Sequence, residues 1–291
     1  MVLLIKTALS IKEFIVMEFI TSDGLELYYE ISGIGQPCVY LHGGPGYWSK
    51  SFQHVTHDLL ESNLKMVYFD QRGCGRSQHS PTQEYSLTRL VDDLEELRQF
   101  LGLNKWYLMG HSFGGILAVN YAYKYPERTK GIILTNATLN MVDSFEHQIR
   151  KGSELLGLSE SELQRDHLDA FMNNFYSILS MLIEKELYFK LQFVDLSNKN
   201  IVDKIDEKCA TDPKFQRFVF SSTEYFQDFT VLTPKIKVPA LIIAGEFDDA
   251  VGPVHQKFKF SNQKIHLIKT AHHPYIENQQ EFKNAVLDFI E

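Results

Sequence analysis

Cysteine is scarce in this sequence, and long apolar runs are missing from it. Only Cys38, Cys74 and Cys209 occur in 291 residues, without a C-x-x-C pair or a Cys/His cluster at metal-ligand spacing. This pattern predicts reduced thiols, a cytoplasmic location and no metal site. No uninterrupted apolar run reaches the ~18 residues that a membrane helix needs, so we expect no membrane partner.

Clusters of basic residues are missing as well. The formal net charge is −8, the pI is near 5.8, and the lysines are scattered along the chain. Nucleic-acid-binding surfaces gather Lys and Arg against the phosphates, so we expect no nucleic-acid partner. The apolar fraction of 44% is enough for a buried core, and we therefore expect a globular protein.

The N-terminal segment MVLLIKTALSIKEFIVMEF is fairly apolar, yet it does not read as a signal peptide. Lys6, Lys12 and Glu13 interrupt it, and no small-residue cleavage site follows clearly. We expect an N-terminal strand in this segment, or an extension that precedes a start at Met17.

Short apolar runs alternate with amphipathic stretches, which is typical of a mostly parallel sheet covered by helices. The segment SLTRLVDDLEELRQFLGL, for example, places leucines at helical spacing with acids and arginines opposite them. The predicted strands are LELYYEIS, which pairs as a hairpin with the segment before Ser22-Asp23-Gly24, and then PCVYLH, KMVYFD, KWYLMG, GIILTN, ALIIAG and KIHLIK.

The alternation stops in the second half of the chain. Between about 141 and 232, helical and aromatic stretches such as FMNNFYSILSMLIEKELYFKLQF replace the strand-like runs. Strand-like sequence resumes at ALIIAG, after Pro234 and Pro239. We therefore predict an α/β core built from residues 1–140 and 233–291, with a helical cap insertion at 141–232.

The motif GHSFGG, residues 110–115, stands between a predicted strand and a predicted helix. A serine on such a sharp turn exposes its hydroxyl, and Gly110 and Gly114 lack the side chains that would obstruct the turn. A serine hydroxyl becomes a good nucleophile only when an imidazole takes its proton and an acid orients that imidazole. Ser112 is therefore a candidate nucleophile.

Candidates for the acid and the base follow in the order Ser, Asp, His, which this arrangement requires. The segment GEFDD overlaps the end of the predicted strand ALIIAG and places Asp248 at its carboxyl end, where open α/β sheets place their sites. His272 and His273 follow the last predicted strand. The position of the two histidines leaves open which of them is the base.

The motifs HGGPG (42–46), DQRGCGRS (70–77), GHSFGG, GEFDD and the histidine turn together resemble the α/β-hydrolases, and more closely their proline iminopeptidase branch. The resemblance covers nearly everything from Glu18 to the end except the insertion. It implies an α/β-hydrolase fold with a mostly parallel sheet of the eight-stranded type. Relatives read H-x-P-aromatic-x-E at the last turn, which matches His272 to Glu277 and favours His272 as the base.

The resemblance also implies roles for other residues. The backbone N–H groups of Gly44 and Phe113 would form an oxyanion hole. Asp249 and Glu224 resemble acids with which relatives hold the free amino terminus of a peptide.

A Ser-His-Asp hydrolase without metal or organic cofactor is the function that these features predict. The resemblance points to a proline iminopeptidase, which releases N-terminal proline from a short peptide. A carboxylesterase or lactonase would use the same triad on a small neutral ester and would need no acids in its pocket. A small-ligand-binding protein on a hydrolase scaffold is a third alternative, because fold alone does not decide function.

Overall fold

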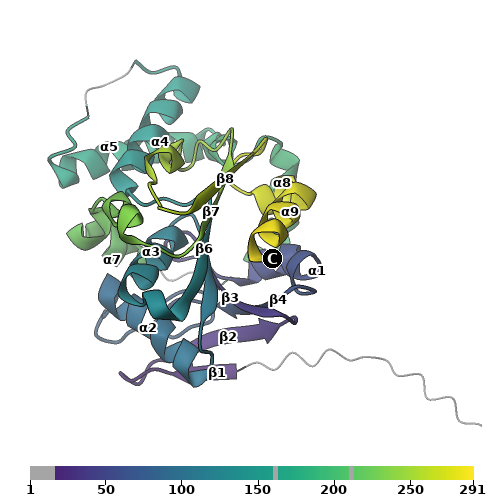
Figure 1. Cartoon of the computed structure of the whole chain (residues 1–291). Helices are drawn as coiled ribbons and strands as arrows, with labels where there is room; N and C mark the ends of the chain where they lie inside the picture. The colour runs from purple at the N-terminus through teal and green to yellow at the C-terminus, as the bar shows by residue number, and fades with distance from the viewer. Residues whose placement is uncertain (1–16, 160–162, 210–212) are drawn as a thin grey trace, which may run out of the picture.

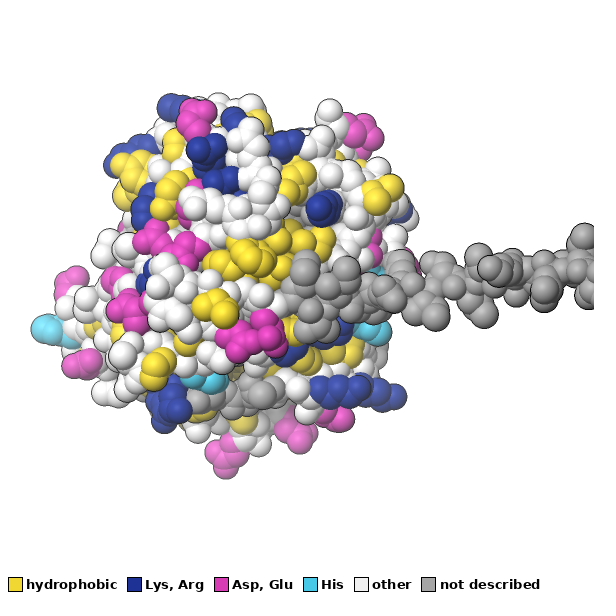
Figure 2. Space-filling view, turned by 90° about the horizontal axis from the view of Figure 1, so that it is seen from below, with side chains coloured by type: hydrophobic (Ala, Val, Ile, Leu, Met, Phe, Trp, Pro, Cys, Tyr) yellow, Lys and Arg dark blue, Asp and Glu magenta, His cyan; other side chains and the backbone are white. Residues whose placement is uncertain are grey.

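The structure is a computed structural model that describes residues 17–159, 163–209 and 213–291. The role predicted for residues 1–16, as a strand or an extension, lies outside this range. Within it, none of the helices combines the length and the apolar composition needed to cross a membrane. On the face seen in Figure 2, basic and acidic side chains are interspersed, as the scattered lysines of the sequence suggest.

One sheet of eight strands runs through the molecule in the order β1-β2-β4-β3-β5-β6-β7-β8 (Figure 1). β1 pairs antiparallel with β2, and β2 with β4, whereas the other neighbours are parallel. The predicted N-terminal hairpin and the mostly parallel sheet are thus confirmed. The strands are β1 (Met17–Ile20), β2 (Glu26–Ser32), β3 (Gln36–Leu41), β4 (Leu64–Phe69), β5 (Trp106–His111), β6 (Thr129–Thr135), β7 (Ala240–Gly245) and β8 (Gln263–Ile268).

Apolar residues fill both faces of the central strands. In β3, Val39 and Leu41 belong to the core on one face, and Cys38 and Tyr40 belong to the core on the other. Side chains alternate between the faces of a strand, so a strand covered on both sides needs a continuous apolar run. This explains why polar residues do not alternate with apolar ones in the strand segments of the sequence.

Helices cover the two faces of the sheet, with α2 and α3 on one side and α1 and α9 on the other (Figure 1). α2 begins where the side chain of Ser86 accepts the amide N–H of Arg89, as expected of a helix cap. Leu90, Leu94 and Leu97 of α2 are buried in the same core cluster as Val39 and Leu41 of β3. The bounds are α1 (Lys50–Leu60), α2 (Leu87–Phe100), α3 (Gly114–Lys124), α8 (Pro274–Glu277) and α9 (Gln279–Ile290), with the short η1 (Pro126–Arg128) and η6 (Val254–Lys257).

A helical segment connects β6 to β7, and its described residues contain no strand. Aromatic rings hold its helices together, since Phe145 and Phe175 stack with their centroids 4.2 Å apart. Gly152 allows α4 and α5 to approach closely, because a Cβ there would lie 2.6 Å from Ile178. The elements are α4 (Met141–Leu156), α5 (Leu168–Glu184), η2 (Tyr188–Leu191), η3 (Leu196–Lys199), α6 (Asn200–Asp206), α7 (Lys214–Ser221), η4 (Thr223–Phe226) and η5 (Phe229–Lys235).

Candidate active site

Ser112 occupies the turn between β5 and α3 in a left-handed backbone conformation, with φ of +53°. A residue other than glycine adopts this conformation only where its surroundings hold it. The amide N–H of Ser112 donates to the carbonyl oxygen of Thr135 at 3.2 Å, and the carbonyl oxygen of Ser112 accepts from the amides of Gly115 and Thr138. These hydrogen bonds fix the strand-to-helix turn that the sequence motif predicts.

Two glycines make this turn possible. A Cβ on Gly110 would lie 2.6 Å from the carbonyl oxygen of Gly114, and a Cβ on Gly114 would lie 2.1 Å from that of Leu41. Both contacts are with backbone that cannot move aside, so a side chain at either position would break the turn.

Asp248 and His272 meet beyond the ends of β7 and β8. Nδ1 of His272 lies 3.0 Å and 3.1 Å from the two carboxylate oxygens of Asp248. The buried carboxylate also accepts the amide N–H groups of Ala250 and Val251. Because Nδ1–H donates to this fixed carboxylate, Nε2 of His272 is the nitrogen left to accept a proton.

His273 makes a different set of contacts. Its Nδ1 lies 2.9 Å from Oη of Tyr275, and its Nε2 lies 3.3 Å from Oε1 of Gln192. Burial holds the pKa of His273 well below its usual value. Both ring nitrogens are thus engaged away from an acid, and the geometry supports His272 over His273 as the candidate base.

A third histidine, His111, stands next to Ser112 and fixes the backbone of the candidate base. Its Nε2 donates to the carbonyl oxygen of His272 at 3.0 Å. Burial holds the pKa of His111 well below its usual value, because a buried site disfavours the charged imidazolium. We did not single out this residue in the sequence, although it directly precedes Ser112 in the motif GHSFGG.

One pocket of about 410 Å³ contains both Ser112 and His272. Oγ of Ser112 forms no hydrogen bond with any described residue, so the Ser112–His272 bond is not closed in this conformation, as is common before a substrate binds. The helical segment supplies the opposite wall of the pocket with Tyr188, Phe189, Phe193, Lys199, Asp203 and Asp206.

Gly44 and Phe113 line a cavity of about 40 Å³ together with Ser112. Within the described part of the chain, neither N–H donates a hydrogen bond to a protein acceptor, which leaves both for a ligand. Phe113 is the residue that caps the N-terminus of α3, where the helix dipole favours negative charge. A Cβ on Gly43 would lie 2.8 Å from Cβ of Ser112, so the glycine loop runs alongside the candidate nucleophile.

Asp249, a predicted substrate-binding residue, is turned away from this pocket. Its Oδ1 lies 2.8 Å from Nε2 of His147 on α4, and its side chain lines two neighbouring cavities that Ser112 does not line. Asp249 therefore does not line the pocket that contains Ser112. The reason is local, because an imidazole of α4 draws the carboxylate outward.

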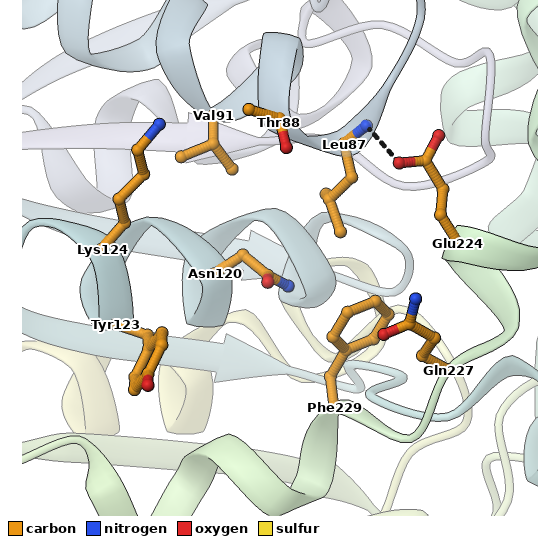
Figure 3. Close-up of a pocket in the computed structure, with 9 residues that line it drawn as sticks. All are labelled: Leu87, Thr88, Val91, Asn120, Tyr123, Lys124, Glu224, Gln227 and Phe229. Carbon is orange, nitrogen blue, oxygen red and sulfur yellow. Dashed lines mark hydrogen bonds between the residues drawn. The ribbon is translucent and has the colours of Figure 1, made fainter.

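Glu224, the other predicted substrate-binding acid, also lies outside the Ser112 pocket. Its Oε2 accepts the amide N–H of Leu87 at 3.2 Å, at the N-terminus of α2, where a carboxylate is stabilised by the helix dipole. Figure 3 shows this contact at one end of a separate pocket of about 400 Å³, with Lys124 at the other end. Glu224 thus ties the helical segment to the core.

Two acids that we did not identify in the sequence, Asp203 and Asp206 of α6, do line the Ser112 pocket. Asp206 accepts hydrogen bonds from Oη of Tyr47 at 2.6 Å and from Nε1 of Trp48 at 3.0 Å. No basic side chain among the described residues pairs with Asp206. Helical spacing in NKNIVDKIDEK was the available signal, since it places these acids on one helix face.

Comparisons with known proteins agree with this fold. The model of the alpha/beta hydrolase fold family matches residues 36–279. The chain is 28% identical over 288 residues to a proline iminopeptidase of Saccharolobus solfataricus, covering 92% of this chain and 90% of that protein. It is 26% identical to a proline iminopeptidase of Thermoplasma volcanium, covering 94% of this chain and 96% of that protein.

Solved structures of two differently named proteins share the fold. A proline iminopeptidase-related protein of Thermus thermophilus aligns with a TM-score of 0.79 at 23% identity, covering 94% of this chain and 96% of that chain. An esterase of Exiguobacterium antarcticum aligns with a TM-score of 0.69 at 20% identity, covering 94% of this chain and 99% of that chain. The same scaffold therefore carries proteins of both names.

Proposed function

The chain belongs to the alpha/beta hydrolase family, and we propose that within this family it is a serine hydrolase with Ser112 as nucleophile, His272 as base and Asp248 as orienting acid. One observation carries the proposal. Ser112 and His272 line the same pocket, and the buried carboxylate of Asp248 holds Nδ1 of His272. This leaves Nε2 to take the serine proton.

In the proposed reaction, Nε2 of His272 removes the proton from Oγ of Ser112 while Oγ attacks the substrate carbonyl carbon. The carbonyl oxygen becomes negative and is held by the amides of Gly44 and Phe113. His272 then gives its proton to the leaving group, which departs and leaves an acyl group on Ser112. A water molecule, deprotonated by His272, attacks the acyl carbonyl. The bond between the acyl carbon and Oγ of Ser112 then breaks, Oγ takes the proton back from His272, and the acid product is released.

The substrate that we propose is a short peptide with an N-terminal proline, as in a proline iminopeptidase. Support comes from the names of the relatives and from Asp206. This residue lines the Ser112 pocket, and the groups that donate hydrogen bonds to its carboxylate, Tyr47 and Trp48, are neutral. A positively charged amino terminus would supply the missing cation. Phe189 and Phe193 offer aromatic surface to the flat proline ring.

A carboxylesterase or lactonase is the second candidate, because Asp249 and Glu224 lie outside the Ser112 pocket. A small neutral ester carries no ammonium group and would need no acid in the pocket. An esterase with the same fold is consistent with this alternative.

Steady-state hydrolysis of three matched substrates separates the candidates. A proline aryl-amide with a free amine, its N-acetylated form and a short-chain aryl ester are compared for the wild type and for Ser112→Ala. Cleavage of the free-amine amide alone supports the iminopeptidase, and cleavage of the ester alone supports the esterase. Turnover at the native rate by Ser112→Ala would refute the serine mechanism itself.

A further inference from the structure

Three charged side chains share one helical face of the Ser112 pocket. Lys199, Asp203 and Asp206 all line this pocket. The backbone of Lys199, directly before α6, is helical with φ of −56° and ψ of −38°, so the helix geometry is continuous from Lys199 to Asp206. Residues at i, i+4 and i+7 lie on the same face, and a rise of about 1.5 Å per residue separates Lys199 from Asp206 by roughly 10 Å.

The two ends of this face differ in charge. Asp206 accepts hydrogen bonds from the neutral donors Tyr47, Trp48 and Ser51, and no described basic side chain forms an ion pair with it. The acidic end of the face therefore carries a net negative charge.

At the other end, Nζ of Lys199 lies 2.6 Å from a carboxylate oxygen of Asp203 and 4.4 Å from the ring centroid of Phe189. The side chains of Lys199 and Asp203 are 29% and 37% exposed. Ion pairs this exposed are weak, so the ammonium of Lys199 can turn to a substrate carboxylate. Asp203 and Phe189 hold it in the pocket until then.

We infer that the pocket selects short zwitterionic peptides, with Asp206 receiving the substrate's ammonium and Lys199 its terminal carboxylate. This inference rests on the proposed aminopeptidase function. An extended peptide grows by about 3.3 to 3.6 Å per residue, so two or three residues span the distance between the two charges. A longer peptide carries its carboxylate past Lys199, and the pocket volume of about 410 Å³ leaves it little room.

The test compares kcat/KM for a proline dipeptide with a free carboxylate, for its C-terminal amide and for a six-residue proline peptide. We expect the wild type to prefer the free dipeptide over the amide by about tenfold, mainly through KM, because a charge-assisted contact is lost in the amide. The longer peptide should behave like the amide.

Lys199→Met should remove this preference by lowering kcat/KM for the free dipeptide to the level of its amide. Because this change frees the carboxylate of Asp203, the double variant Lys199→Met/Asp203→Asn is measured too, since it keeps the net charge of the pocket. Lys204→Met is the matched control. Lys204 is exposed on the same helix but does not line the pocket, and its variant should keep the wild-type preference.

Equal kcat/KM for the dipeptide and its amide in the wild type would overturn the inference, as would a preference that survives in both Lys199 variants. Thermal unfolding of each variant shows that it is folded. If the wild type cleaves no free-amine proline substrate, the proposed iminopeptidase function fails. If such substrates are cleaved equally well with and without a free carboxylate, the iminopeptidase function stands and only the role of Lys199 fails.

Discussion

Nδ1 of His272 lies 3.0 Å from Oδ2 of Asp248, across a separation of 24 residues in the chain. The neighbouring His273 has no carboxylate partner among the described residues and contacts Tyr275 and Gln192 instead. A carboxylate at Nδ1 stabilises the imidazolium that forms when the base takes a proton, whereas a phenol and an amide do so far less. His272 is therefore better suited than the adjacent His273 to act as the base.

Replacing each histidine in turn tests this difference. We expect His272→Ala to reduce kcat by about 10³-fold or more, because the triad acts as a unit. His273→Ala should stay within about tenfold of the wild type, since this ring only lines the pocket. The measurement is kcat on any substrate that the wild type turns over. A large loss with His273→Ala and a small one with His272→Ala would contradict the assignment.

Gly44 combines a left-handed backbone with φ of +114° and a Cβ position 2.7 Å from the amide nitrogen of Gly46. We expect Gly44→Ala to displace the amide that holds the oxyanion and to lower kcat by about 10²- to 10³-fold. Gly24→Ala is the matched control, because Gly24 also has a positive φ of +83° but has open space around it. That variant should lose some stability and keep its kcat. Equal losses of kcat in both variants would refute the oxyanion role.

The parts of the site that follow strand ends were predictable from the sequence. Ser112 and Asp248 follow buried apolar runs within three residues of their ends, and the carboxyl ends of parallel strands lie at one edge of the sheet. The glycines around Ser112 were equally predictable, because the backbone segments approach so closely there that any side chain would clash. For these residues, the local sequence pattern and the overall fold indicate the same positions.

The acids of the pocket were not predictable in the same way. Helical spacing shows that Asp203 and Asp206 share a face, but it does not show what that face contacts. The positions of Asp249 and Glu224 depend on His147 and on the amide of Leu87, which are far away in the sequence. The direction of a charged side chain is therefore decided by tertiary contacts that neither periodicity nor resemblance reveals.

These positions predict an order of effects for three acids. We expect Asp206→Asn to raise KM for the free-amine proline aryl-amide by about tenfold or more, because the amide side chain keeps the hydrogen-bond geometry and loses the charge. Asp249→Asn and Glu224→Gln should change KM by no more than about twofold. KM and kcat are measured for all three variants. The proposed role of Asp206 is wrong if Asp249→Asn or Glu224→Gln raises KM more than Asp206→Asn does.

His111 allows a test of the buried histidines that does not depend on activity. Its ring is buried, and burial holds its pKa well below the ordinary value of 6.5. The unfolded chain then binds a proton near pH 6 that the folded chain does not bind. The free energy of unfolding therefore rises with pH through about 6.5 and falls as the pH drops below it.

The variant His111→Gln removes this proton while its amide can still donate to the carbonyl oxygen of His272. We expect the free energy of unfolding to fall less between pH 7.5 and 5.5 in His111→Gln than in the wild type, by about 1.4 kcal/mol. Carboxyl groups such as Asp23 and Glu95, whose pKa values are lowered to about 2, lose their stabilising effect only at lower pH, so they do not obscure this window. Urea unfolding at several pH values gives the measurement, with His167→Gln at an exposed histidine as control. If His111→Gln and the wild type show the same pH dependence, His111 takes up a proton in the folded protein and is not held neutral by burial.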